Sequence, residues 1–145
     1  MKLHKNMKRS LLLMALMALL LIVAGCTKME YARPAVYGKI YCTNSNPQVG
    51  DTVILKVEVP DAGNRIYHAD YYWRCGDQFS QTVRKTAPDN SKTITEAPTL
   101  KWVFQKSGSF TVTMNAKFKF SMTDANGALL GGASASGTIR INPKK

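Results

Sequence analysis

The sequence predicts an all-β fold, an antiparallel β-sandwich of about seven strands that follows an export signal. After residue 34, no long segment has the period of an amphipathic helix; short runs rich in β-branched and aromatic residues alternate with turns rich in Asn, Pro and Gly. In residues 110–123, apolar and polar residues alternate without exception. This period of two is typical of a strand with one buried face.

The first 25 residues predict a removable signal peptide. Residues 1–9 are basic, and the apolar run 11–25 spans 15 residues, which is short of the ~20 that a transmembrane helix needs. The run ends in Val23-Ala24-Gly25-Cys26, which resembles the lipobox of bacterial lipoprotein signals. The resemblance implies that the Cys26 thiol is acylated and that Cys26 becomes the first residue of the mature protein. Several acyl chains (palmitate and its relatives) then hold the protein on a lipid bilayer.

Residues 26–34 are expected to form a short polar tether, and residues 35–145 the sandwich. Thr27 follows the acylated cysteine, and the lipoprotein resemblance then implies an outer-membrane location, because inner-membrane retention is associated with aspartate there. Surface-exported lipoproteins carry an acidic run after the cysteine, whereas this chain has one base and one acid, Lys28 and Glu30. This favours the periplasmic face over the cell surface.

Composition excludes several classes of protein. The chain of 145 residues has 20 Lys and Arg against 9 Asp and Glu, a formal net charge of +11. Four of these bases and no acid lie in the signal, so 16 bases face 9 acids in the rest, a net charge of +7. Hydrophobic content of 45% excludes a disordered chain, and 120 mature residues make one domain. After the signal only one histidine, His68, remains, so neither a zinc site nor any other cofactor is expected.

The strands can be placed by pattern. We expect them at residues 35–42, 52–59, 66–75, 79–84, 99–104, 110–123 and 137–142. The small, Gly-rich residues 128–137 are interpreted as a connection before the last strand. A strand over 110–123 would be long for a small sandwich, so we expect a bend near Asn115 and Ala116 or a projecting end.

From residue 46 to 142 the chain resembles a PKD domain, an immunoglobulin-like module of extracellular proteins. The turn that opens the family pattern matches Pro47-Gln48-Val49-Gly50-Asp51. The central signature of the family, aromatic-x-Trp-Asp-Phe-Gly-Asp-Gly, matches Tyr71-Tyr72-Trp73-Arg74-Cys75-Gly76-Asp77-Gln78. Arg74, Cys75 and Gln78 depart from that signature. Later parts match Ser107-Gly108-Ser109-Phe110-Thr111-Val112 and Asp124-Ala125-Asn126-Gly127. The signature residues are Gly50, Asp51, Trp73, Gly76, Asp77, Gly108, Asp124 and Gly127. On physical grounds Trp73 is expected in the core.

Two cysteines remain besides Cys26, namely Cys42 and Cys75. Both have inward parity in their predicted strands, and an exported protein can oxidise its thiols. We therefore expect a disulfide between them; the alternative is two buried thiols that never meet.

The sequence shows no catalytic constellation. His68 stands near Asp70, but no Gly-x-Ser-x-Gly elbow occurs and no pair of acids is set apart, so an enzyme is not expected. Asp77 has no neighbouring acids with which to hold calcium. An envelope location and the absence of a cluster of arginines and aromatic residues exclude nucleic acid as a partner.

We expect a non-catalytic lipoprotein that acts as a protein–protein interaction or scaffold module. By analogy of architecture, one form of this function is an accessory lipoprotein of an envelope-spanning secretion assembly. The candidate partner face contains Lys117, Lys119 and Arg140, which would attract an envelope protein or an anionic glycan. The same charges could instead only keep the surface solvated. The alternative function is glycan recognition through exposed Tyr67, Tyr72 and Trp102.

Overall fold

The computed structural model describes residues 32–88, 93–120 and 130–145. The predicted signal peptide, Cys26 and most of the tether lie outside the described residues, as do residues 89–92 and 121–129. Among the described residues, no helix has the length and apolar character that crossing a membrane requires.

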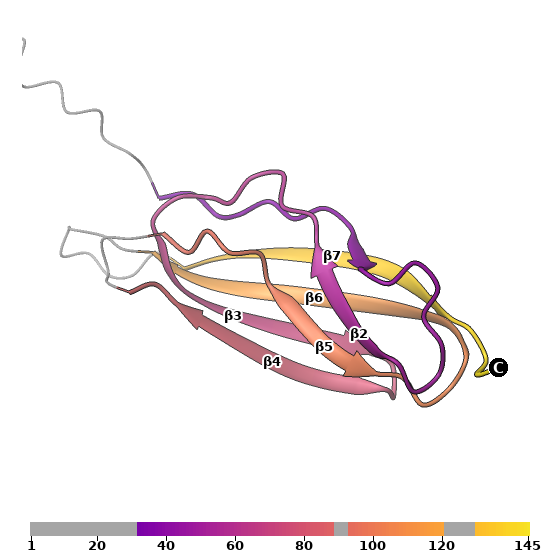
Figure 1. Cartoon of the computed structure of the whole chain (residues 1–145). Helices are drawn as coiled ribbons and strands as arrows, with labels where there is room; N and C mark the ends of the chain where they lie inside the picture. The colour runs from indigo at the N-terminus through magenta and orange to yellow at the C-terminus, as the bar shows by residue number, and fades with distance from the viewer. Residues whose placement is uncertain (1–31, 89–92, 121–129) are drawn as a thin grey trace, which may run out of the picture. The chain divides into compact units, whose positions relative to one another are not determined.

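Seven strands form two antiparallel sheets that face each other (Figure 1). The strands are β1 (Ile40–Cys42), β2 (Thr52–Val57), β3 (Ile66–Cys75), β4 (Phe79–Thr86), β5 (Thr99–Val103), β6 (Gly108–Phe120) and β7 (Leu130–Ile141). One sheet has the order β1-β2-β5 and the other has the order β4-β3-β6-β7. This is an immunoglobulin-like sandwich in which a sheet of three strands faces a sheet of four. The predicted fold class is confirmed.

The core lies between the sheets and follows the predicted alternation. Trp73 is fully buried on β3, with Tyr71 and Cys75 on the same side of the strand. On β6 the inward side chains from Val112 to Phe120 are all buried, and Phe110 is half-buried. On β2 the buried side chains are Val53, Leu55 and Val57. The inward faces of β3 and β6 are therefore as predicted.

The last strand begins earlier than predicted. Strand β7 starts at Leu130, so the Gly-rich segment interpreted as a connection belongs to the strand. Glycine is needed at two points of this segment: a Cβ at Gly131 would meet the Phe120 ring, and a Cβ at Gly137 would collide with the carbonyl oxygen of Ile40, where β1 approaches β7 closely. The composition that argued against a strand thus reflects close contacts of β7 with residues of β6 and β1.

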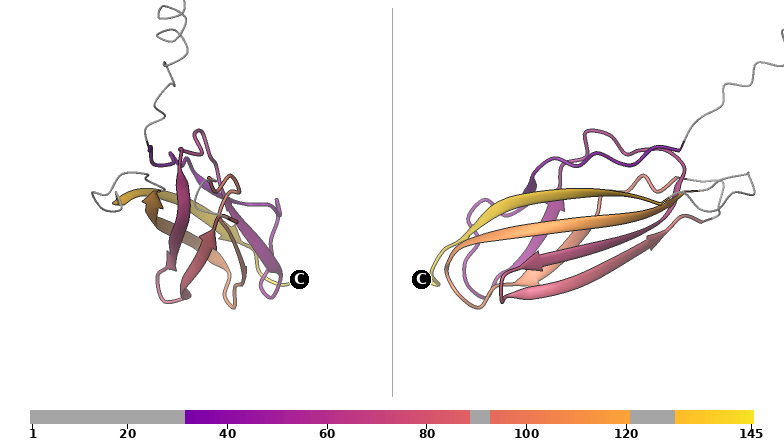
Figure 2. Two further views of the ribbon diagram at one scale, coloured as in Figure 1. Left: turned by 90° about the vertical axis from the view of Figure 1, so that its left-hand side faces the viewer. Right: turned by 180° about the vertical axis from the view of Figure 1, so that it is seen from behind.

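Of the two alternatives expected for the long strand β6, an interruption near Asn115 and Ala116 does not occur. The pairing of β6 with β7 runs without a break from Gly108 to Lys119, and Asn115 and Ala116 pair regularly with Ser134 and Ala133. The two long strands run side by side along the sandwich (Figure 2). The irregularity lies on the neighbouring strand, between Ile66 and His68 of β3. The long strand stays paired because β7 is nearly as long.

The segment before β1 closes the sandwich along one side. Val36 pairs with Asp61, and Lys39 forms a parallel bridge with Ser136 of β7. The described chain begins at one end of the sandwich, and its C-terminus lies at the other end, where Gln48 bridges to Asn142 (Figures 1 and 2).

Strand β4 is an edge strand of the four-stranded sheet, and a charged side chain, Lys85, lies on its inner side. Lys85 lies opposite buried Ala69, and its Nζ is 2.8 Å from Oε2 of Glu96. The ion pair satisfies an ammonium group that would otherwise lie at the margin of the core, and the neighbouring lysine lowers the pKa of Glu96.

Candidate functional site

The candidate partner face lies on the outer side of the four-stranded sheet. Lys117 and Lys119 of β6 and Arg140 of β7 are all exposed there, as the alternation predicted. They do not form one cluster, however. Lys117 pairs with Gly132, and Arg140 lies eight residues farther along β7, which is roughly 26 Å in an extended strand. The two lysines and the arginine therefore lie toward opposite ends of the face.

The sheet register brings β3 and β4 residues beside the lysines that sequence reasoning did not group with them. Asp70 pairs with Lys117 on one side and with Arg84 on the other. In the next row, His68 pairs with Lys119 on one side and Thr86 on the other. The register between strands, which brings these residues together, could not be read from the sequence.

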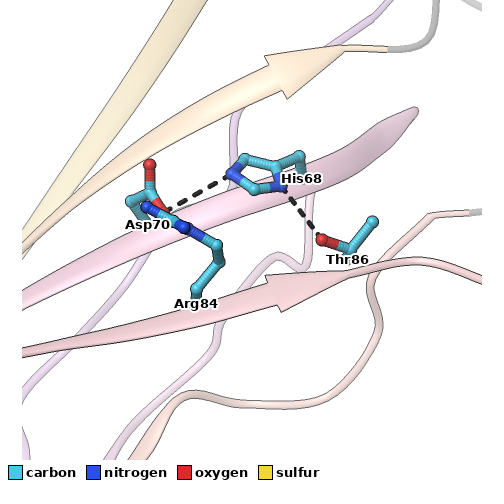
Figure 3. Close-up of polar contacts among 4 residues, drawn as sticks. All are labelled: His68, Asp70, Arg84 and Thr86. Carbon is cyan, nitrogen blue, oxygen red and sulfur yellow. Dashed lines mark hydrogen bonds and ion pairs between the residues drawn. The ribbon is translucent and has the colours of Figure 1, made fainter.

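These β3 and β4 side chains form a connected polar group (Figure 3). Arg84 donates from Nε to Oδ1 of Asp70 over 2.7 Å, and Nε2 of His68 is 3.4 Å from the same oxygen. The other imidazole nitrogen, Nδ1, lies 3.0 Å from the Thr86 hydroxyl. The hydrogen bond from Arg84, followed by the charges of Arg84 and His68, holds the pKa of Asp70 below its ordinary value despite partial burial.

Thr86, His68 and Asp70 are linked in the same order as the hydroxyl, imidazole and carboxylate of a hydrolytic triad. The carboxylate, however, has a different charged partner. The Asp70 oxygen that faces His68 already accepts from Arg84, so the carboxylate primarily neutralises a guanidinium group. This group therefore fixes the charged side chain of Arg84 on the outer surface of the sheet.

The aromatic residues considered for glycan recognition do not gather on one face. Trp102 packs against Phe79 with ring centroids 4.9 Å apart, and its indole nitrogen is buried. Tyr72 lies on the outer face, but the Lys117 ammonium is 5.5 Å from the centre of its ring. Tyr67 lies in the irregular part of β3, beside His68. A flat row made of these three rings is therefore not present.

The signature residues in the described part of the chain have structural roles. Gly50 has φ of 90° in the turn before β2, where Asp51 accepts a hydrogen bond from the Gln48 amide at 2.9 Å. Gly76 and Asp77 form the β3–β4 hairpin turn, closed by the Gln78 amide donating to the Cys75 carbonyl at 2.8 Å. Gly108 opens β6, whereas Asp124 and Gly127 lie outside the described residues.

The predicted disulfide is not present. Cys42 and Cys75 are both free thiols, Cys42 half-buried and Cys75 buried. Cys42 ends β1, whose neighbour across the sandwich is β7, whereas Cys75 ends β3, two strands away from β7. Both side chains point inward, as their positions in the strands predict, but they lie beside different strands. Burial, with a smaller contribution from Asp77, raises the pKa of the Cys75 thiol.

Within residues 32–88, 93–120 and 130–145, no three His, Cys, Asp or Glu side chains are grouped so as to hold a metal ion.

Comparison with known proteins gives one structural similarity. No family model and no curated protein matches the chain. The structure is similar to the PKD domain of an M14-like peptidase from a Thermoplasmatales archaeon, with 16% sequence identity and a TM-score of 0.43 over 79% of this chain and 100% of that chain.

Proposed function

We propose that this protein is a non-catalytic lipoprotein whose sandwich docks an acidic protein partner at the bacterial envelope. In this proposal, acylated Cys26 holds the chain on the periplasmic face of the outer membrane. The partner belongs to an envelope-spanning assembly, by analogy of architecture.

One observation supports the docking part of the proposal most strongly. Among the described outward side chains of the four-stranded sheet, the bases are Arg74, Arg84, Lys117, Lys119 and Arg140, and Asp70 is the one acid. Because Asp70 is paired with Arg84, it does not offset the lysines of β6. A face of this kind attracts a negatively charged partner and speeds its encounter.

A protein partner fits this face better than a neutral glycan does. A row of exposed aromatic rings would suit a sugar, but Trp102 is half-buried against Phe79, Tyr72 is covered by Lys117, and Tyr67 lies apart in the irregular part of β3. The polar side chains of β6 and β7, by contrast, provide many hydrogen-bonding groups along two long strands.

The proposal is tested by recovering partners from envelope extract with wild type and with Lys117→Glu/Lys119→Glu. We expect the variant to lose the partners that wild type releases as salt is raised. The matched control is Lys56→Glu/Lys101→Glu, which makes the same charge change on the three-stranded sheet. If the first variant recovers the same partners with the same salt sensitivity as wild type, the charges of β6 serve solvation only.

A further inference from the structure

A hollow of about 440 Å³ lies on the outer side of β6 and β7. Thr113 and Asn115 of β6 form one side, and Ser134 and Ser136 of β7 form another. Lys39 and Gly38, from the segment that crosses beside β7, close the hollow at the edge of the sheet.

The hollow exists because the outward side chains of β7 are short. Gly132, Ser134 and Ser136 stand opposite Lys117, Asn115 and Thr113 in the sheet register. Lys39 is held at the opposite rim by its backbone: its amide donates to Oε2 of Glu58 at 3.1 Å, and its bridge to Ser136 fixes its height along β7. Backbone contacts thus fix the position from which the lysine side chain projects.

The polar side chains of the hollow have no partners among the described residues. The side chains of Lys39, Thr113, Asn115, Ser134 and Ser136 form no hydrogen bond or ion pair within that part of the chain. An ammonium group, three hydroxyls and an amide therefore lie around one concave surface with their bonding capacity unused.

We propose that this hollow binds a carboxylate side chain of an acidic polypeptide. The inference rests on the proposed function and deepens it, because it names where on the basic face the partner is held. A carboxylate accepts from both ammonium and hydroxyl donors, and Lys39 provides the opposite charge. The Glu58 carboxylate accepts from the Lys39 amide.

The spacing of the cations predicts the spacing of the acids. Ser136, at the hollow, and Gly132, opposite Lys117, are four residues apart on β7, or about 13 Å in an extended strand. An extended partner segment presents residues i and i+4 on one side at the same separation. We expect a Glu-x-x-x-Glu segment to place one carboxylate in the hollow and the other beside Lys117.

The test is an NMR titration of the isotope-labelled full chain in detergent micelles. The probe is the peptide Ser-Glu-Ser-Ser-Ser-Glu-Ser, compared with a peptide in which both Glu residues are Gln. We expect the acidic peptide to shift the Lys39, Asn115, Ser134 and Ser136 resonances and the Gln peptide not to shift them. Lys39→Gln should weaken binding by about two- to fivefold. Ser136→Phe, which fills the hollow, should abolish these shifts, whereas Ser80→Phe on the far edge strand should leave them unchanged.

The outcomes separate this inference from the proposed function. If Lys117→Glu/Lys119→Glu weakens peptide binding while Lys39→Gln and Ser136→Phe do not, the hollow is not the site, although the basic face still docks an acidic partner. If a sulfated tetrasaccharide shifts the same resonances at lower concentration than the peptide does, the polypeptide assignment is overturned. Spectra of each variant without peptide show whether it is folded.

Discussion

Arg84 donates to Asp70 over 2.7 Å and so ties the edge strand β4 to β3 on the outer face of the sheet. The interaction lies at the surface, where Arg84 is 69% exposed and Asp70 is 18% exposed. Solvent therefore screens it, and its contribution to stability is small.

Asp70→Asn should lower the free energy of unfolding by about 0.2–1 kcal/mol at neutral pH. The pKa of Asp70 is below its ordinary value of 3.8 in the folded protein, so this stability is present above that pH and is lost as the pH falls through the lowered pKa. Urea unfolding of both proteins at pH about 7 and about 2 measures the difference. In an Arg84→Gln background, Asp70→Asn should have little further effect. If Asp70→Asn costs the same at both pH values, packing and not charge is responsible.

Trp73→Ala should cost on the order of 3–5 kcal/mol, because it removes a fully buried ring from between the two sheets. Trp73→Phe should cost less, since the Trp73 indole nitrogen has no hydrogen-bond partner among the described residues. Thermal unfolding measures both. Tyr41→Ala, at a side chain 43% exposed on β1, is the control and should change stability by no more than about 0.5 kcal/mol. An unchanged melting temperature for Trp73→Ala would contradict the core assignment.

Cys42 and Cys75 should both be recovered as thiols from envelope-purified protein. Half-buried Cys42 should react with a maleimide in the folded protein, whereas buried Cys75, whose pKa is raised, should react only after unfolding. Labelling followed by peptide mapping measures this, with Cys42→Ser and Cys75→Ser identifying each product. A cross-linked peptide that contains both residues would contradict the structure.

Cys26→Ala should release the protein from membranes, if the lipobox resemblance of residues 23–26 has the consequence proposed. Fractionation of cells that express each form measures the distribution, and Thr27→Ala is a neighbouring control that keeps the thiol. If mass spectrometry of the membrane fraction finds mature protein with an unmodified Cys26, the lipoprotein proposal is contradicted.

The sequence predicted strands well where one face is buried and one is solvated. In β6 every second residue has to be apolar, so the pattern specified both the strand and its inward side. It failed in the first half of β7, where a Cβ at Gly131 would meet the Phe120 ring and a Cβ at Gly132 the Ala116 carbonyl oxygen, because such contacts favour small residues and leave no alternation to read. The prediction of the disulfide failed for a related reason. The alternation within a strand shows that a cysteine points into the sandwich, but it does not show which strand the cysteine lies beside.

The candidate site was predicted only in part. The outward position of Lys117 and Lys119 followed from alternation within one strand. Their neighbours Asp70 and His68 depend on the register between β3 and β6, which is shifted by the irregularity after Ile66. Lys39 comes from a segment almost 100 residues before its neighbour Ser136, and no local pattern links two such positions.

The charge that Lys85 places on the inner side of β4 governs how copies of the protein behave when they are crowded. An edge strand eight residues long offers a template on which a second chain could continue the sheet. A strand added there would have to cover the Lys85 ammonium or draw it away from Glu96, 2.8 Å distant. Acyl anchors, as proposed, would confine many copies to two dimensions, where collisions between edges are frequent. The ion pair then disfavours pairing between the edge strands of different copies, so that each copy stays separate.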